Sequence, residues 1–316
     1  MSTDTSDGLW AVTAYYNPAR FKRRLKNYHV FRQHLTVPLV AVELSFDGTF
    51  DLAPDDAEIL IQLHGGDIMW QKERLLNIGF RHLPRSCDKV AWLDCDVIFD
   101  TDDWMVRASR TLDELAIVHL FEERHDLAPD AETEPRPTPN ATPTALSSIY
   151  KLATGQAVPD EFVRMGAVGA LRSTTGLAWA GRREVLDRHG LYDAAIVGGG
   201  DKANICAALG RFDDVIVGHE MNAARAKHYL AWARPFAATV QGAVGCIPAR
   251  IFHLWHGDLK DRQYVVRHAW LEGFDPVADI ALDRNGCWSW SSNKQDLHAR
   301  IRRYFELRHE DGTGIV

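Results

Sequence analysis

The chain has 316 residues, 46% of them hydrophobic and 25% charged, which is the composition of a globular protein with a substantial core. Its formal net charge of −7 excludes an overall basic surface for nucleic acid or anionic membranes. No apolar run reaches the roughly 18 residues that a membrane-spanning helix needs. The polar N-terminus lacks a signal-peptide pattern and the five cysteines include no C-x-x-C pair, so we expect a reduced, cytoplasmic protein.

Strand-like and helix-like segments alternate over residues 9–123. Short apolar runs predict strands at residues 9–14, 39–44, 58–63, 89–93 and 115–121. Helical spacing of apolar residues covers residues 20–34 and the stretch from 70 to 80. This alternation predicts an α/β fold in which a mostly parallel central sheet is flanked by helices on both faces. In such a sheet, a ligand binds at the carboxyl ends of the strands.

The rest of the chain is less regular but has no clear domain boundary, so we treat residues 1–316 as one domain. Residues 128–160 are rich in Pro, Thr, Ala and Glu, which predicts a flexible insertion, either a plain linker or a lid over the active site. Residues 166–257 contain glycine-rich turns, two helices and a strand at 247–255. Residues 258–316 form a C-terminal extension that ends in an amphipathic helix at 297–307.

Asp94 and Asp96 flank Cys95 directly after the predicted strand at 89–93. Two carboxylates where a buried strand opens into a loop can hold a divalent cation, and hard oxygen ligands suit Mg²⁺ or Mn²⁺. Such a cation can bridge the adjacent phosphates of a nucleoside diphosphate. The alternative is a pair of solvated aspartates at a strand end.

His253 and His256 form a His-x-x-His pair near the end of the predicted strand at 247–255. Imidazole is an acceptable ligand for Mn²⁺. Side chains alternate along a strand, so we expect the two histidines to point to opposite faces and one of them to reach the metal. His256 is favoured because Gly257 permits a sharp turn after it. Either residue could instead be an ordinary hydrogen-bonded histidine.

The turn Gly198-Gly199-Gly200-Asp201 opens a predicted helix. Glycines let a backbone approach a ligand closely, so Gly199 and Gly200 are candidates for contacting a sugar. Asp201 is either a helix cap or a general base that takes a proton from an attacking hydroxyl. Trp179, in the preceding segment 176–180, could form the floor beneath the sugar.

Lys72 lies on the helix at 70–80, with Glu73 and Asn77 on roughly the same side, facing the strand ends. A lysine in this position could offset phosphate charge. The alternative is an ordinary amphipathic helix with solvated charges.

These motifs occur in an order that resembles GT-A glycosyltransferases: a nucleotide-binding half, a D-x-D motif, a G-G-x-D-like acceptor motif and a late metal-binding histidine. The segment QKERLLNIGF at 71–80 resembles the helix that precedes the D-x-D strand in that family. The resemblance extends over about residues 9–257. It implies a Rossmann-like GT-A domain, a nucleotide-sugar donor and Mn²⁺ or Mg²⁺.

The resemblance also implies roles for particular residues. Asp94 and Asp96 correspond to the D-x-D motif, Asp201 to the acceptor-side base, and His253 or His256 to the late histidine. Nucleotide contacts are expected from residues at the ends of the first two strands, which are Thr13, Ala14, Tyr15, Glu43 and Asp47. Further contacts are expected from Lys72 and from Asp94, Cys95 and Asp96. Glu43 and Asp47 stand where the family usually has paired acidic residues.

We therefore expect metal-dependent transfer of a hexose from a nucleoside diphosphate sugar to an acceptor hydroxyl, with inversion if Asp201 is the base. The acceptor is a glycan, a small molecule or, less favoured by the acidic charge, a hydroxylated DNA base. One alternative is a nucleotidyltransferase acting on a sugar phosphate, although residues 15–18 lack its glycine-rich basic loop. The other is a non-catalytic sugar-binding protein, which needs neither the metal nor Asp201.

Overall fold

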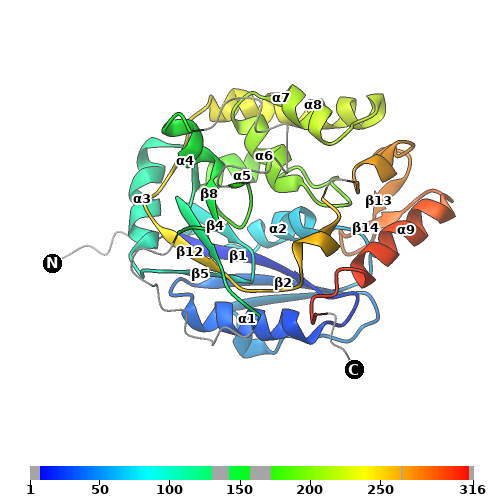
Figure 1. Ribbon diagram of the computed structural model, residues 1–316, viewed down its shortest axis with the longest axis horizontal. Helices are drawn as coiled ribbons and strands as arrows, with labels where there is room; N and C mark the ends of the chain where they lie inside the picture. Colours follow the sequence, from blue (N-terminus) through cyan, green and yellow to red (C-terminus); the bar gives the residue numbers. More distant parts are fainter. Residues whose placement is uncertain (1–7, 130–141, 157–171, 265, 313–316) are drawn as a thin grey trace.

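The computed structural model describes residues 8–129, 142–156, 172–264 and 266–312 (Figure 1). Its centre is a seven-stranded sheet with the strand order β11-β6-β10-β4-β1-β2-β3. These strands are β1 (Leu9–Tyr16), β2 (Leu39–Ser45), β3 (Ile59–His64), β4 (Lys89–Leu93), β6 (Ile117–His119), β10 (Ala178–Arg182) and β11 (Val244–Cys246). Strand β10 runs antiparallel to both neighbours and the other pairs are parallel, so the predicted mostly parallel sheet is confirmed.

The central strands are apolar on both faces because each face is covered. In β2, Val40 and Val42 belong to one buried cluster of side chains, whereas Leu39 and Ala41 belong to the other. This is the continuous apolar run expected of a buried parallel strand. It explains why the first four strands lie within two residues of their predicted ends.

Helices complete the two clusters. One side is covered by α2 (Lys72–Phe80), α5 (Arg183–His189), α6 (Gly200–Ala208) and α8 (Ala223–Val240), and the other by α1 (Lys22–His34) and α3 (Trp104–Glu114). In Figure 1, α1 lies below the sheet and α2 and α6 lie above it. The result is the predicted α/β arrangement, with helices on both faces.

A second sheet and a hairpin complete the fold. The second sheet has the order β5-β12-β7-β8-β9, and β13 pairs with β14 in the hairpin. Their bounds are β5 (Val97–Phe99), β7 (Glu123–Asp126), β8 (Ala145–Ser147), β9 (Arg172–Thr174), β12 (Arg250–His253), β13 (Ile280–Leu282) and β14 (Trp288–Trp290). The remaining helices are α4 (Ser148–Ala153), α7 (Phe212–Gly218), α9 (Gln295–Glu306), and the 3₁₀ turns η1 (Pro54–Asp56), η3 (Leu259–Arg262) and η4 (Ala269–Leu271).

The insertion predicted to be flexible at residues 128–160 is partly regular. Strand β8 pairs with β7, and the Ser147 hydroxyl caps α4 by accepting from the backbone N–H groups of Ile149 and Tyr150. Composition does not indicate these elements, because it carries no information about pairing with another strand, and the flexibility of the insertion stays a prediction. Residues 130–141 and 157–160 of the predicted insertion lie outside the described residues.

The C-terminal extension packs back onto the sheet. On α9, Ile301, Tyr304 and Phe305 are buried, and the Phe305 ring lies 6.1 Å from Tyr16 and 6.5 Å from Trp70 between centroids. The extension therefore lies against the carboxyl ends of the central strands. Among the helices in the described ranges, none is long and apolar enough to cross a membrane.

Candidate active site

The Asp94-Cys95-Asp96 segment connects the two sheets. It leaves β4 of the central sheet and enters β5 of the second, where β12 pairs antiparallel with β5 and His253 stands opposite Val97. The backbone N–H of Leu254 donates to the Asp96 carbonyl at 2.8 Å. This pairing brings the late histidines to the D-x-D segment, more than 150 residues away in sequence.

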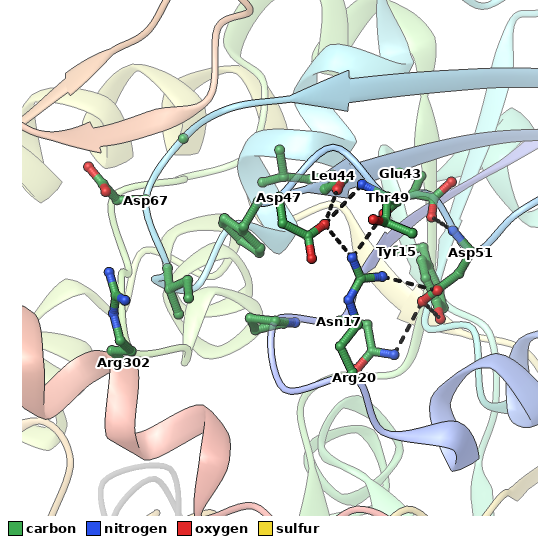
Figure 2. A pocket seen from close by; sticks show the side chains of 15 residues that line it. Tyr15, Asn17, Arg20, Glu43, Leu44, Asp47, Thr49, Asp51, Asp67 and Arg302 are labelled. Atoms are coloured by element: carbon green, nitrogen blue, oxygen red, sulfur yellow. Dashed lines mark hydrogen bonds and ion pairs between the residues drawn. The ribbon is translucent and has the colours of Figure 1, made fainter.

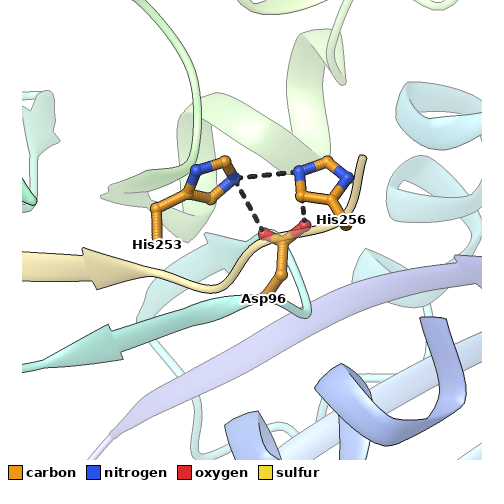
Figure 3. Close-up of side chains that lie close together, drawn as sticks. All are labelled: Asp96, His253 and His256. Carbon is orange, nitrogen blue, oxygen red and sulfur yellow. Dashed lines mark hydrogen bonds and ion pairs between the residues drawn. The ribbon is translucent and has the colours of Figure 1, made fainter. Parts of the chain in front are cut away.

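Asp96, His253 and His256 converge on one point (Figure 3). Their potential ligand atoms all lie within 4.8 Å of one another, and they form the one such group found in the described ranges. His256 Nε2 lies 3.3 Å from Asp96 Oδ2 and 3.0 Å from His253 Nε2, and His253 Nε2 lies 3.8 Å from Asp96 Oδ1. A cation about 2.1 Å from each ligand separates neighbouring ligands by about 3 Å, so these spacings fit a divalent cation.

Two further observations support a metal at this point. Asp96 Oδ1 is a buried acceptor without a hydrogen-bond partner among the described residues. Behind His253, the ring Nδ1 lies 3.1 Å from Asp126 Oδ1. A proton on Nδ1 that bonds this carboxylate leaves Nε2 with its lone pair toward Asp96, as in metal sites where an outer carboxylate orients the ligating imidazole. The donor set of one carboxylate and two imidazoles suits Mn²⁺ better than Ca²⁺.

The expectation that the two histidines point to opposite faces was wrong, and which of them binds a metal stays a prediction. It rested on a strand over 247–255, but β12 ends at His253. His256 lies beyond the end of the strand, so the alternation of faces does not reach it and both rings turn toward Asp96. The guanidinium of Arg262 contacts His256 Nδ1, which places the C-terminal extension directly behind the group.

Asp94 does not join this group in the structure. Its carboxylate lies 2.5 Å from Lys72 Nζ, and the same nitrogen donates to Asp201 at 2.9 and 3.2 Å. Burial alone would lower the pKa of Lys72, but the two carboxylates outweigh it and raise that pKa well above its ordinary value. Lys72 therefore pairs with both Asp94 and Asp201, whereas the sequence predicted a contact with phosphate.

Glu73 follows Lys72 on α2 and is buried beside the Asp94 and Asp201 carboxylates. A Cβ atom on Gly200 would lie 2.2 Å from the Glu73 carboxyl, so the glycine is what allows α6 to begin against this side chain. Burial, together with the nearby Asp201 carboxylate, raises the pKa of Glu73. Burial likewise raises the pKa of Asp94, against the lowering effect of Lys72.

A pocket of about 260 Å³ opens at the carboxyl ends of β1 and β2 (Figure 2). The Tyr15 hydroxyl and the Asn17 side-chain amide donate to the Asp51 carboxylate, at 2.8 and 3.2 Å. Arg20 contacts Asp47 and donates to Asp51 at 3.2 Å. Hydrogen bonds thus fix the polar wall of the pocket before any ligand arrives.

Glu43 supports the same wall of the pocket through hydrogen bonds to the loop that follows β2. Its carboxylate accepts from the backbone N–H of Asp51 at 2.5 Å and of Leu52 at 3.3 Å, and from the Gln62 side chain at 2.9 Å. Glu43 is buried and fixes the loop that follows β2, whereas the Asp47 side chain is exposed to the pocket.

Other residues predicted to bind the nucleotide have structural contacts. The Thr13 hydroxyl donates to the Leu93 carbonyl at 2.7 Å and joins β1 to β4. Ala14 packs against one buried cluster and Cys95 is buried in the other. Tyr15 alone of the three β1 candidates lines the pocket.

The three residues predicted to contact sugar also have structural roles. Trp179 is 3% exposed, and its indole stacks on His119 with centroids 4.0 Å apart, so it belongs to the core. Gly199 has a φ of 92°, in the left-handed region that favours glycine, and precedes the first residue of α6. Gly200 lies against Glu73 as described above.

The sequence missed Asp126, Asp51 and Arg262. Asp126 ends the short strand β7, whose residues Glu123–Asp126 are all polar or charged and carry no apolar signal. A rule that searches for carboxylates at every strand end would have found it. Arg262 could not have been found, because its contact with His256 depends on how the C-terminal extension folds back.

No protein-family model matches the chain, and no curated protein matches it. Among solved structures, it is similar to a mannosyltransferase from Pyrobaculum calidifontis in complex with GDP-Man and Mn²⁺ (13% identity, 96% of this chain and 70% of that chain, TM-score 0.41). It is also similar to glucosyl-3-phosphoglycerate synthase from Mycobacterium tuberculosis (11%, 87% and 82%, 0.40) and to residues 1–349 of TarS from S. aureus (10%, 95% and 71%, 0.38).

Proposed function

We propose that the protein is a metal-dependent glycosyltransferase that moves a sugar from a nucleoside diphosphate sugar to an acceptor hydroxyl. The observation that carries this proposal is the convergence of Asp96, His253 and His256, with Asp126 behind His253, at the carboxyl edge of the central sheet. These residues would hold Mn²⁺ or Mg²⁺. When bound, the cation supplies positive charge that stabilises the leaving diphosphate.

The pocket beside β1 and β2 suits the nucleoside of the donor. Its volume of about 260 Å³ is slightly below the roughly 300–1,000 Å³ of small-molecule sites. The Tyr15 ring is 1% exposed and supports the wall through its hydroxyl, whereas the Asp47 and Asp51 carboxylates offer acceptors for base or ribose N–H and O–H groups. Tyr15 lies on β1, the neighbour of β4, so a donor seated here directs its phosphates toward Asp96.

Asp201 is the base we propose for the acceptor hydroxyl. Its carboxylate is partly exposed, stands in the first turn of α6 and is oriented by Lys72. A carboxylate fixed in this way can accept the proton as the hydroxyl attacks, and attack from the face opposite the leaving group inverts the anomeric centre. The acceptor remains within the classes named from the sequence, and the site gives no support to DNA among them.

The nucleotidyltransferase alternative is disfavoured by one contact. Such an enzyme needs a free cation after the first strand to meet triphosphate. Arg20, the first cation after β1 in the sequence, lines the pocket and already pairs with Asp47 and Asp51. The free thiols of Cys87, Cys95, Cys206, Cys246 and Cys287 suit the reducing cytoplasm, which we propose as the location.

The test adds a panel of UDP-, GDP- and TDP-sugars and Mn²⁺ to the protein. Two quantities are measured: the thermal stability of the protein and the rate at which the donor is hydrolysed, with water acting as the acceptor. At least one donor should stabilise the protein in a metal-dependent way, and Asp96→Asn should remove that effect. Asp201→Asn should keep the stabilisation and slow hydrolysis by about 10²–10⁴-fold, the usual contribution of a general base. If no donor binds with metal, the proposal fails. If the Asp201→Asn variant hydrolyses the donor at the wild-type rate, Asp201 is not the base.

A further inference from the structure

Four nitrogen-bearing side chains gather behind the glycine turn that opens α6. They are Lys202, His219, Arg267 and His268, which are 2%, 2%, 4% and 5% exposed. A Cβ atom on Gly199 would lie 2.8 Å from the His219 ring and 3.0 Å from the His268 ring, and one on Gly198 would lie 3.2 Å from the Arg267 guanidinium. The absence of side chains at the turn is what lets these groups close around it.

Each of the four carries a buried nitrogen that lacks a hydrogen-bond partner within the described ranges. These atoms are Lys202 Nζ, His219 Nε2, Arg267 Nε and His268 Nδ1. Arg267 does donate through another nitrogen to the Tyr304 hydroxyl at 2.9 Å. Leaving one buried polar group unpaired costs about 1–3 kcal/mol, so four together demand an explanation.

The neighbouring carboxylates do not supply that explanation. Asp201 is paired with Lys72, and Asp214, which lies in range of Lys202, is in contact with Arg211. The His219 and His268 rings stack face to face, with centroids 4.0 Å apart. Burial lowers the pKa of both histidines and of Lys202, and repulsion from neighbouring cationic side chains lowers the pKa of the histidines further. The cluster is therefore rich in groups that can take a proton and poor in counter-charge.

We propose that this cluster binds an anionic group, a phosphate or a carboxylate, carried by the sugar acceptor. The proposal rests on the proposed function and identifies the class of its acceptor. An anion beside Lys202 and Arg267 would satisfy the unpaired nitrogens and restore the charge of the lysine. The first turn of α6 adds its free N–H groups, which also favour an anion.

The position of the cluster favours the acceptor over the donor. Lys202 follows the proposed base, Asp201, in the same helical turn. The metal-binding group is flanked instead by Arg262, which contacts His256, and by Asp126. An acceptor held by its anionic group at the cluster can thus present a hydroxyl to Asp201, while the donor diphosphate lies at Asp96.

The first experiment measures inorganic phosphate and acetate as probes, without metal or nucleotide, by thermal stability and calorimetry. Phosphate or acetate should stabilise the wild type, and the preferred probe identifies the class of anion. Lys202→Met should bind that probe about 10- to 100-fold more weakly, as expected for the loss of a charged hydrogen bond. Lys227→Met, which replaces an exposed lysine of α8, should bind like the wild type.

Without an anion, Lys202→Met should be at least as stable as the wild type, because it removes an unpaired buried ammonium. A wild type that binds neither probe, or a Lys202→Met variant that binds as tightly as the wild type, overturns the proposal. So does a Lys202→Met variant that loses much stability without an anion, because the lysine then has a structural partner.

A second arm separates this proposal from the function on which it rests. The Mn²⁺-dependent stabilisation by nucleotide should be the same in Lys202→Met and the wild type. If Lys202→Met loses that stabilisation as well, the cluster serves the donor and the acceptor assignment is wrong. Glycerol 3-phosphate should bind in a Lys202-dependent way and glycerol should not, because the anionic group and not the hydroxyl is recognised.

Discussion

At the residue scale, the candidate site depends on a carboxylate that is not itself a ligand. Asp126 faces His253 Nδ1 and also pairs with Arg124 at 2.9 Å. A hydrogen bond from Nδ1 fixes both the tautomer and the orientation of the imidazole. His253 is thereby prepared to offer Nε2 to a cation, whereas a solvent-exposed histidine would be free to rotate.

We expect Asp126→Asn to weaken Mn²⁺ binding by about 10- to 100-fold, as for other outer-shell partners of metal-binding histidines. The measurement is a Mn²⁺ titration in the presence of nucleotide. Asp102→Asn, at an exposed aspartate near the same sheet, is the matched control and should bind like the wild type. Equal Mn²⁺ affinity in Asp126→Asn and the control would remove Asp126 from the site.

At the element scale, α2 is held unusually close to the sheet. A Cβ atom on Gly79 would lie 2.5 Å from Val12 Cγ1 and 3.1 Å from Val42 Cγ2. These valines are on the adjacent strands β1 and β2, which cannot separate without breaking the sheet. The close approach lets Lys72, at the start of the same helix, reach Asp94 and Asp201.

Gly79→Ala tests this contact. In an exposed helix this change would stabilise by about 1 kcal/mol, but here we expect a loss of about 1–3 kcal/mol from overpacking. Urea unfolding gives the free energy of unfolding. Gly273→Ala is the control, because no atom lies within 4 Å of its added Cβ, and it should change stability little. A stabilised Gly79→Ala variant would show that α2 can move away from the sheet.

The elements differ in how far the sequence could predict them. Strand β4 was predicted at its observed bounds, because a strand buried on both faces is an uninterrupted apolar run ended by Asp94. Strand β12 was predicted too long, because Leu254 and Trp255 are apolar although they lie outside the ladder. The convergence of Asp96 with two histidines depends on the register between β5 and β12, which no local pattern encodes.

At the scale of the whole molecule, a buried cluster of charged side chains joins α1 to the C-terminal extension. The Glu310 carboxylate accepts from Arg24 of α1 at 2.7 and 2.9 Å and from Arg308 at 2.7 Å, and Arg262 lies 3.7 Å away. Burial alone would raise the pKa of Glu310, but the three guanidinium groups outweigh it and hold that pKa well below its ordinary range. Arg262 links this group to His256 of the candidate metal site.

Because the pKa of Glu310 is depressed in the folded state, its contribution to stability is complete above its ordinary pKa and is lost as the pH falls below it. We expect Glu310→Gln to cost about 3–5 kcal/mol at pH 7, since it leaves buried arginines unpaired. The difference in the free energy of unfolding between Glu310→Gln and the wild type should be about 2 kcal/mol smaller at pH 3 than at pH 7. Urea unfolding at pH 7, 5 and 3 measures both effects.

Glu306→Gln, at an exposed position of α9, should be neutral at each pH. A gap between Glu310→Gln and the wild type that stays constant with pH would show that the Glu310 carboxylate titrates normally in the folded protein.

We propose that Asp96, His253 and His256 bind one divalent cation together, and electron paramagnetic resonance of bound Mn²⁺ measures this binding. With UDP present, the wild type and Asp102→Asn should each bind one Mn²⁺ per chain. Asp96→Asn, His253→Gln and His256→Gln should each bind it at least about tenfold more weakly, because each removes one ligand from the same ion. Wild-type Mn²⁺ affinity in all three variants would show that these three residues do not bind the cation.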